Sequence, residues 1–199
     1  MPADQKALKI IERTGGIIHT AEAIKKGIHP RTLYLLRDTG QLTTVSRGIF
    51  RLADLPELTQ PDLATVAARV PHAVICLVSA LSFHNLTTQR PATVSIAIAS
   101  SARSPRIDFP PLSVFRFSEE SLSAGVEKHL FDGIAVRIFS PEKTIADCLK
   151  FRNKIGFDIF AEALKLYRAR RRFDVDALLA YGRTCRVERL MKPYLEALL

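Results

Sequence analysis

Hydrogen-bond donors gather on one face of a short helical pattern over residues 30–39. Successive residues of a helix are about 100° apart, so Leu33 and Leu36 share one side. The polar side chains on the opposite side and its flanks are Arg31, Thr32, Tyr34 and Arg37. Arginine can donate two hydrogen bonds to guanine, while threonine and tyrosine can reach a phosphate or a thymine methyl group. This pattern indicates a helix that contacts nucleic acid.

Two more arginines follow in a predicted β-hairpin. Arg47 belongs to the tight-turn signal Ser46-Arg47-Gly48, and Arg51 lies on the same arm. An arginine at a hairpin tip is placed to enter the minor groove or to contact the DNA backbone. The predicted DNA-binding residues are therefore Arg31, Thr32, Tyr34, Arg37, Arg47 and Arg51. The alternative is a three-helix scaffold with solvated charges that binds another protein.

Acidic residues in the second half of the chain offer a different chemistry. Asp108, Glu142 and Asp147, with Lys143 nearby, are carboxylates that could share a metal ion in a nuclease. Glu142 and Asp147 are five positions apart on one predicted helix, so their side chains diverge by about 140° and would need further ligands. His84 is expected to cap a helix or to be partly buried. The sequence has no GxGxxG, P-loop, HExxH or GxSxG motif, so we expect no enzyme, catalytic residue, cofactor or metal site.

Positive charge is concentrated at both ends of the chain. The net charge is +9, and residues 1–56 hold 9 Lys/Arg against 5 Asp/Glu. Residues 57–149 hold 8 against 9, and residues 150–199 hold 12 against 6. This balance indicates a polyanionic partner. The run RARRR at 168–172 has two interpretations, either cations that stabilise the C-terminal end of a helix or a second phosphate-contacting patch.

Cysteine usage and hydropathy indicate an intracellular protein. Cys76, Cys148 and Cys185 form no CxxC pair, so each is expected to be a small buried apolar residue. No apolar run approaches the ~18–20 residues of a membrane span. The first residues lack the apolar stretch of a secretory signal. We therefore predict a cytoplasmic protein with no membrane partner.

The elements that would position the donors follow the order of a winged helix-turn-helix. Helical patterns cover residues 3–13, 20–26 and 30–39, and strand-like runs cover 42–45 and 49–52. The second helix is expected to end at Gly27, and the third is expected to begin with Pro30 in its first position. Ile28, in the turn, is expected to pack between the two helices. A winged helix-turn-helix places one helix in the DNA major groove. The segment 53–61 carries two prolines and marks the predicted boundary between domains 1–56 and 57–199.

The second predicted domain mixes strands and helices. Residues 74–78 form either a strand or the lead into a helix over 79–85. Strand-like runs cover 93–99, 113–117 and 134–139, and helical patterns cover 62–69, 142–151, 158–170, 175–181 and 187–198. The last pattern carries an apolar stripe from Val187 to Leu198 at helical spacing. We predict an α+β fold, with an N-terminal winged helix-turn-helix followed by a mixed α/β C-terminal domain that ends in a helical bundle.

Several strings of the sequence resemble the AbiEi-type antitoxins, bacterial transcriptional regulators of abortive-infection toxin–antitoxin pairs. HPRTLYLLRDTGQL followed by SRGIFRL resembles the N-terminal domain of that family. SALSFHNLT (79–87) and IFSPEKTIADCLKF (138–151) resemble blocks of its C-terminal domain. The resemblance implies that the winged helix represses its own operon at inverted repeats, with DNA contacts at Arg31, Thr32, Tyr34, Arg37 and Arg47. It also implies that residues 62–199 counteract a nucleotidyltransferase-like toxin.

The predicted function is that of an antitoxin and autoregulatory transcriptional repressor. Its predicted partners are double-stranded DNA with an inverted repeat and a cognate nucleotidyltransferase-like toxin. The protein counteracts this toxin either by binding it or without direct contact. A small winged helix buries limited surface on DNA, so we expect a monomer or dimer that pairs on the operator. Two alternatives remain, a ligand-responsive winged-helix regulator without a toxin and a DNA-targeted, metal-dependent nuclease that uses Asp108 or Asp147.

Overall fold

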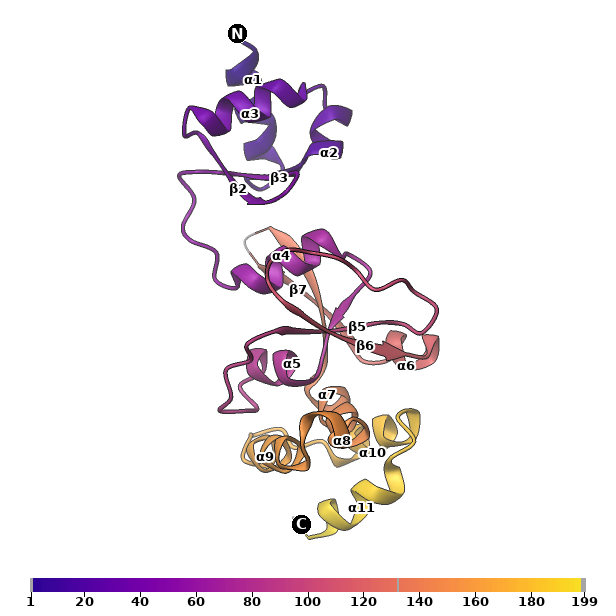
Figure 1. Cartoon of the computed structure of the whole chain (residues 1–199). Coiled ribbons are helices and arrows are strands. Elements are labelled where there is room, and N and C mark those ends of the chain that lie inside the picture. The colour runs from indigo at the N-terminus through magenta and orange to yellow at the C-terminus, as the bar shows by residue number, and fades with distance from the viewer. Residues whose placement is uncertain (1, 132, 198–199) are drawn as a thin grey trace. The chain divides into compact units, whose positions relative to one another are not determined.

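The computed structural model describes residues 2–131 and 133–197, and its contacts divide the chain into two compact units. The first unit consists of residues 1–71 and 130–135, and the second consists of 72–129 and 136–199. Figure 1 shows the helices and strands of both. The mixed α+β fold class is confirmed. The contacts place the division at 71/72, whereas a domain that ends at residue 56 stays a prediction.

The first unit combines helices with a small antiparallel sheet. Its elements are α1 (Ala3–Arg13), β1 (Ile17–His19), α2 (Thr20–Lys25), α3 (Pro30–Asp38), β2 (Leu42–Ser46), β3 (Ile49–Leu52) and α4 (Pro61–Arg69). The sheet has the order β1-β3-β2, so β3 is its central strand. Strand β1 was not predicted, because three residues are too few to show a periodicity. The helices and the hairpin lie where the sequence predicts them.

The core of the first unit explains the positions of its helices. Ile11 of α1, Leu33 and Leu36 of α3, and Phe50 of β3 are buried in one apolar cluster. Gly27 has a φ of +81° and ends α2, which lets the next residue turn into the core. That residue is Ile28, which is buried as predicted. At the start of α3, Pro30 occupies the first turn and the Nδ1 atom of His29 accepts the Arg31 backbone N–H at 3.2 Å.

The second unit is built from a mixed sheet and a run of helices. Its elements up to β7 are β4 (Val74–Ile75), α5 (Leu77–Phe83), β5 (Val94–Ala99), β6 (Leu112–Phe117), α6 (Glu119–Ser123) and β7 (Val126–Phe131). They are followed by β8 (Ile134–Phe139), α7 (Pro141–Lys150), α8 (Arg152–Ile155), α9 (Phe157–Arg168), α10 (Val175–Thr184) and α11 (Glu188–Glu196). The end of β7 and the start of β8 fall within residues 130–135, which are grouped with the first unit. The sheet order is β6-β5-β4-β8-β7, with β5/β6 and β4/β8 parallel and β4/β5 antiparallel. Elements α6, α8 and β7 were not predicted.

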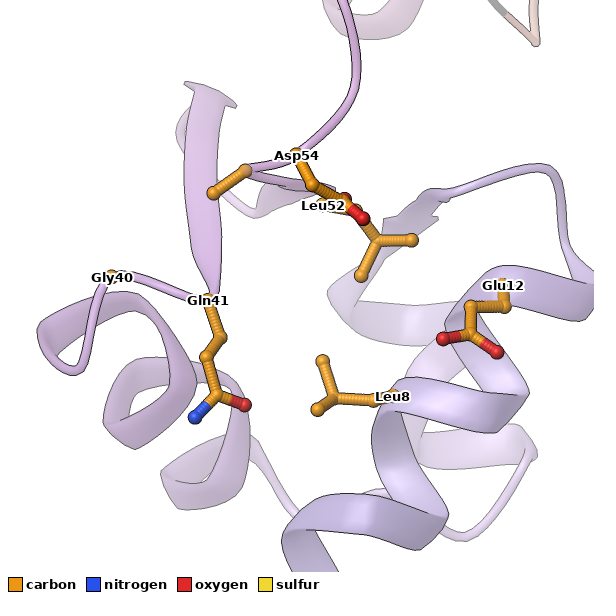
Figure 2. A pocket seen from close by; sticks show the side chains of 7 residues that line it. Leu8, Glu12, Gly40, Gln41, Leu52 and Asp54 are labelled. Atoms are coloured by element: carbon orange, nitrogen blue, oxygen red, sulfur yellow. The ribbon is translucent and has the colours of Figure 1, made fainter.

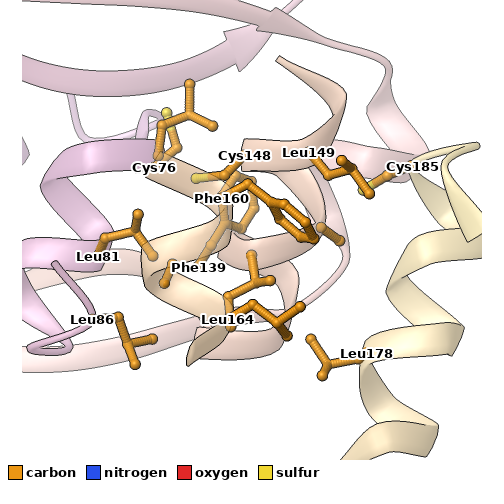
Figure 3. Packing of buried hydrophobic residues seen from close by; sticks show 14 of the residues in the cluster. Cys76, Leu81, Leu86, Phe139, Cys148, Leu149, Phe160, Leu164, Leu178 and Cys185 are labelled. Atoms are coloured by element: carbon orange, nitrogen blue, oxygen red, sulfur yellow. The ribbon is translucent and has the colours of Figure 1, made fainter. Parts of the chain in front are cut away.

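Apolar side chains from α5, α7, α9 and α10 meet in the core of the second unit (Figure 3). Cys76, Cys148 and Cys185 are free thiols buried in this core, as predicted. Burial raises the pKa of Cys76 and Cys148 above the ordinary thiol value and raises the pKa of Cys185 to about 12. Since the thiolate is the reactive form, burial and a raised pKa disfavour reaction at all three thiols.

A buried ion pair lies inside this apolar core. The Lys143 Nζ and Asp147 Oδ2 atoms are 2.5 Å apart, one turn from each other on α7, and both side chains have no exposed surface. Cys185 Sγ donates to the other carboxylate oxygen at 3.1 Å, and the Lys143 ammonium lies 4.2 Å from the centre of the Phe139 ring. Gly125 is required beside the pair, because a Cβ atom there would lie 2.7 Å from the Cβ of Lys143.

The terminal helices pack in sequence. Helix α7 contacts α9 and α10, and α10 contacts α11. In the predicted apolar stripe, Val187, Met191 and Leu195 are buried, whereas Leu190 and Tyr194 are exposed. Leu198 lies outside the described residues. That these helices form a bundle stays a prediction. Within residues 2–131 and 133–197, no helix has both the length and the apolar character needed to cross a membrane.

Candidate nucleic-acid interface

The outer face of α3 is exposed and carries polar and apolar side chains. Leu33 and Leu36 are buried, so the predicted inner face of the helix is confirmed. Arg31 is exposed, Thr32 is half-buried, and 45% of Tyr34 is exposed. These side chains are therefore on the surface of the first unit. Their contact with DNA stays a prediction.

Arg37 is exposed but has partners within its own helix. Its Nε and Nη2 atoms donate to the Asp38 carboxylate at 2.9 and 2.7 Å, and its guanidinium lies 5.0 Å from the Tyr34 ring centre. Tyr34 in turn contacts the edge of Phe50 at a centroid distance of 5.5 Å. A phosphate would compete with Asp38 for Arg37, so we expect Arg37 to contribute less to DNA binding than Arg31.

Leu35 is a surface residue that the sequence reasoning missed. It lies on the outer face of α3 and 49% of it is exposed. The helical period contained the signal, because Leu35 is two positions, or about 200°, from the buried Leu33. Apolar side chains on a recognition helix contact thymine methyl groups. An exposed leucine beside Arg31 and Tyr34 therefore fits a helix that reads bases.

The tip of the β2–β3 hairpin is held from two sides, and Arg47 is exposed on it. The backbone N–H and the Oγ1 hydroxyl of Thr20 donate to the Gly48 carbonyl at 2.9 and 3.1 Å. Arg69 of α4 donates from Nη1 to the Arg47 carbonyl at 3.3 Å. Arg69 is thus a positioning residue for the hairpin tip. The sequence carried no signal for it, since the contact joins positions 22 residues apart.

Arg51 does not lie on the surface, where its predicted DNA contact requires it to be. Only 6% of it is exposed, and its guanidinium donates to the carbonyls of Leu55, at 3.4 Å from Nη1, and Pro56. The physical reason is the unpredicted strand β1, which pairs Ile17 with Arg51 and makes β3 a central strand. Every residue of β3 is buried. Through these two hydrogen bonds, Arg51 instead holds the backbone of the segment that follows the hairpin.

The carboxylates considered for a metal site have separate partners in the second unit. Asp147 is buried with Lys143, while Glu142 accepts a hydrogen bond from the Tyr167 hydroxyl. Asp108 lies exposed in the loop before β6. The described part of the chain contains no cluster of three or more His, Cys, Asp or Glu side chains able to hold a metal ion. The structure therefore does not bring the three acidic residues together.

His84 and one arginine of the 168–172 run make structural contacts in the second unit. His84 ends α5 and is half-buried, with its Nε2 atom 2.8 Å from the Phe139 carbonyl, and burial lowers its pKa below the ordinary value. Arg170 donates to the backbone carbonyl of His84. The neighbouring arginines of the 168–172 run are exposed, namely Arg168, Arg171 and Arg172. Both interpretations of this run therefore stay open.

Part of the first unit is similar to a known protein family. A family model described as a transcriptional regulator, AbiEi antitoxin, matches residues 5–53. The match runs from α1 to the end of the hairpin, and it confirms the resemblance to the AbiEi family over about a quarter of the chain. Nothing among curated proteins matches the chain. The strings at 79–87 and 138–151 lie outside the matched residues, so their resemblance stays a prediction.

Proposed function

We propose that this chain, whose residues 5–53 match the AbiEi antitoxin family of transcriptional regulators, is an autoregulatory repressor that binds DNA through a winged helix-turn-helix. The observation that carries the proposal is the exposed face of α3 beside the braced hairpin tip. Arg31, Tyr34 and Leu35 offer donors and an apolar contact on the helix, and Arg47 offers a cation on the hairpin. Helix α3 then lies in the major groove and the hairpin acts as the wing.

The roles of the exposed residues follow from their places on these elements. Arg31 is in the first turn of α3, where recognition helices contact base edges, so it donates to guanine. Thr32 and Tyr34 contact phosphates or a thymine methyl group, and the wing residue Arg47 contacts the minor groove or the backbone. Because one small module buries limited surface, two protomers bind the two halves of an inverted repeat.

The salt dependence of binding tests this proposal. Fluorescence anisotropy with the full chain and a duplex from its own promoter should show an affinity that falls steeply with salt. For ~4–6 phosphates contacted per protomer, the slope of log affinity against log salt is roughly −4 to −5. A duplex of the same composition with the inverted repeat scrambled is the control. Binding that ignores ionic strength, or that is equal for the scrambled duplex, contradicts the proposal.

We further propose that residues 62–199 counteract a nucleotidyltransferase-like toxin encoded next to this chain. The support is the family match of the first unit together with the two C-terminal strings that resemble antitoxin blocks. Co-expression of the full chain from an unrelated promoter should restore growth of cells that carry the neighbouring toxin. The matched control is a variant with Arg31→Ala and Arg47→Ala, which should rescue equally well because rescue does not need the operator. Growth arrest that persists despite soluble full chain would refute the antitoxin role and leave the DNA-binding proposal standing.

A further inference from the structure

A pocket of about 320 Å³ opens in the first unit at the end of α3 (Figure 2). It is lined by Leu8, Glu12, Gly40, Gln41, Leu52, Ala53 and Asp54. These residues come from α1, from the turn between α3 and β2, and from the end of β3 and the residues after it. The pocket therefore touches three of the elements that set the position of the proposed recognition helix.

The walls of the pocket are tied together by backbone hydrogen bonds. The Ala53 N–H donates to the Gln41 carbonyl at 3.0 Å, and the Leu52 N–H donates to the Gly16 carbonyl at 2.9 Å. These bonds hold the end of the hairpin beside the turn that follows α3. The pocket is thus part of the folded module rather than a gap between loose loops.

The lining combines an apolar surface with carboxylates. Leu8 and Leu52 provide the apolar surface, and Glu12 and Asp54 provide two negative charges. Among the described residues, the lining of the pocket contains no lysine or arginine. In Figure 2 the Gln41 amide and the Glu12 carboxylate approach the space from opposite sides. The pocket thus offers hydrogen-bond acceptors without an internal cation.

The charge of the pocket is opposite to that of the module around it. Residues 1–56 hold 9 Lys/Arg and only 5 Asp/Glu, yet two of those five acids line this one pocket. A phosphate of DNA is repelled from such a site, whereas a cation is attracted. The volume lies at the lower end of the range for small-molecule sites, so it suits a compact ligand.

We infer that this pocket binds a small organic cation, with an ammonium, amidinium or guanidinium group held by Glu12 and Asp54 and an apolar body against Leu8 and Leu52. The bound cation contacts α1 together with the end of β3 and the residues that follow it. Because α1 packs against α3, we expect ligand and operator affinity to be coupled, and by linkage each then changes the other by the same factor. The coupling rests on the proposed DNA-binding function, whereas ligand binding does not.

Titration of the full chain without DNA tests the site directly. Benzamidine is the probe, and benzamide, its neutral analogue of similar shape, is the ligand control. Calorimetry should detect benzamidine binding and at least about tenfold weaker binding of benzamide, the factor expected when a charge-assisted hydrogen bond is lost. Equal binding of the two compounds, or no binding of benzamidine, overturns the inference.

A pair of charge-matched variants locates the bound cation. The double variant Glu12→Gln and Asp54→Asn should lose benzamidine affinity by about tenfold or more. The double variant Glu57→Gln and Glu196→Gln removes the same charge at exposed positions outside the pocket and should bind as the natural chain does. Circular dichroism confirms the fold of each variant. Unchanged binding by the pocket variant places the ligand elsewhere and overturns the site.

Operator binding measured with saturating benzamidine separates the two parts of the inference. A changed operator affinity, together with the same change in benzamidine affinity on addition of DNA, supports an effector site. If benzamidine binds but the operator affinity is constant, the effector role is overturned. If the chain binds benzamidine but never binds its promoter, the proposed DNA-binding function fails and the ligand site stands.

Discussion

Lys143→Met is expected to lower the free energy of unfolding of the second unit by about 3–5 kcal/mol. The substitution removes the ammonium that lies 2.5 Å from the Asp147 carboxylate, where neither side chain has exposed surface. Asp147 would keep only the weak Cys185 thiol donor at 3.1 Å. A carboxylate without a cation in an apolar core costs far more than the loss of a surface ion pair.

Urea denaturation followed by circular dichroism measures this loss. Lys165→Met is the matched control, because Lys165 is an exposed lysine on α9 and the same substitution there leaves no buried charge behind. The double variant Lys143→Met and Asp147→Leu removes both charges and should be more stable than Lys143→Met alone. If Lys143→Met unfolds within about 1 kcal/mol of Lys165→Met, the pair does not hold the core together.

The pH dependence of this loss identifies its electrostatic origin. Burial raises the pKa of Asp147 above its ordinary value of 3.8, and the Lys143 ammonium opposes that rise. A carboxyl with a raised pKa in the folded state contributes stability below its unfolded pKa and loses that contribution as the pH rises through its folded pKa. Without Lys143 the folded pKa is higher still. The gap in stability between the natural chain and Lys143→Met should therefore narrow as the pH falls toward 4.

The sequence was informative where local signals decide the structure. Pro30 and Gly40 mark the two ends of α3 both in the sequence and in the structure. The turn signal Ser46-Arg47-Gly48 correctly predicts the hairpin. The face of α3 that carries Arg31 followed from the helical period alone. These features depend on residues a few positions apart, which is the range over which periodicity and turn chemistry act.

Contacts between residues far apart in the sequence could not be predicted from local patterns. The burial of Arg51 depends on its pairing with Ile17, 34 positions away, and the brace from Arg69 depends on the packing of α4. The buried ion pair, by contrast, has a local signal in the sequence. Lys143 and Asp147 have the i, i+4 spacing of a helical ion pair, yet Asp147 was considered as a metal ligand. Spacing could have suggested the pair but not its complete burial.

Arg31→Ala is expected to weaken binding to the operator by about 1–3 kcal/mol, or ~5- to 150-fold, and to relax the base preference at one position of each half-site. Arg31 is exposed, and its backbone N–H donates to the Nδ1 atom of His29. Its side chain is therefore available for a base. Anisotropy titrations against the operator and against duplexes substituted at single positions measure both effects.

Three other arginines of the same module make the prediction specific. A contact from Arg47 to the DNA backbone predicts that Arg47→Ala weakens binding to every duplex alike and reduces the salt slope by about 1. Arg37→Ala should have a smaller effect than Arg31→Ala, since Asp38 already holds that guanidinium. Arg51→Ala should lower the stability of the module, because the Leu55 and Pro56 carbonyls lose their donor. An Arg31→Ala variant that keeps full affinity and the same base preference, while Arg37→Ala loses both, would move the base-reading contact from the first turn of α3 to its last.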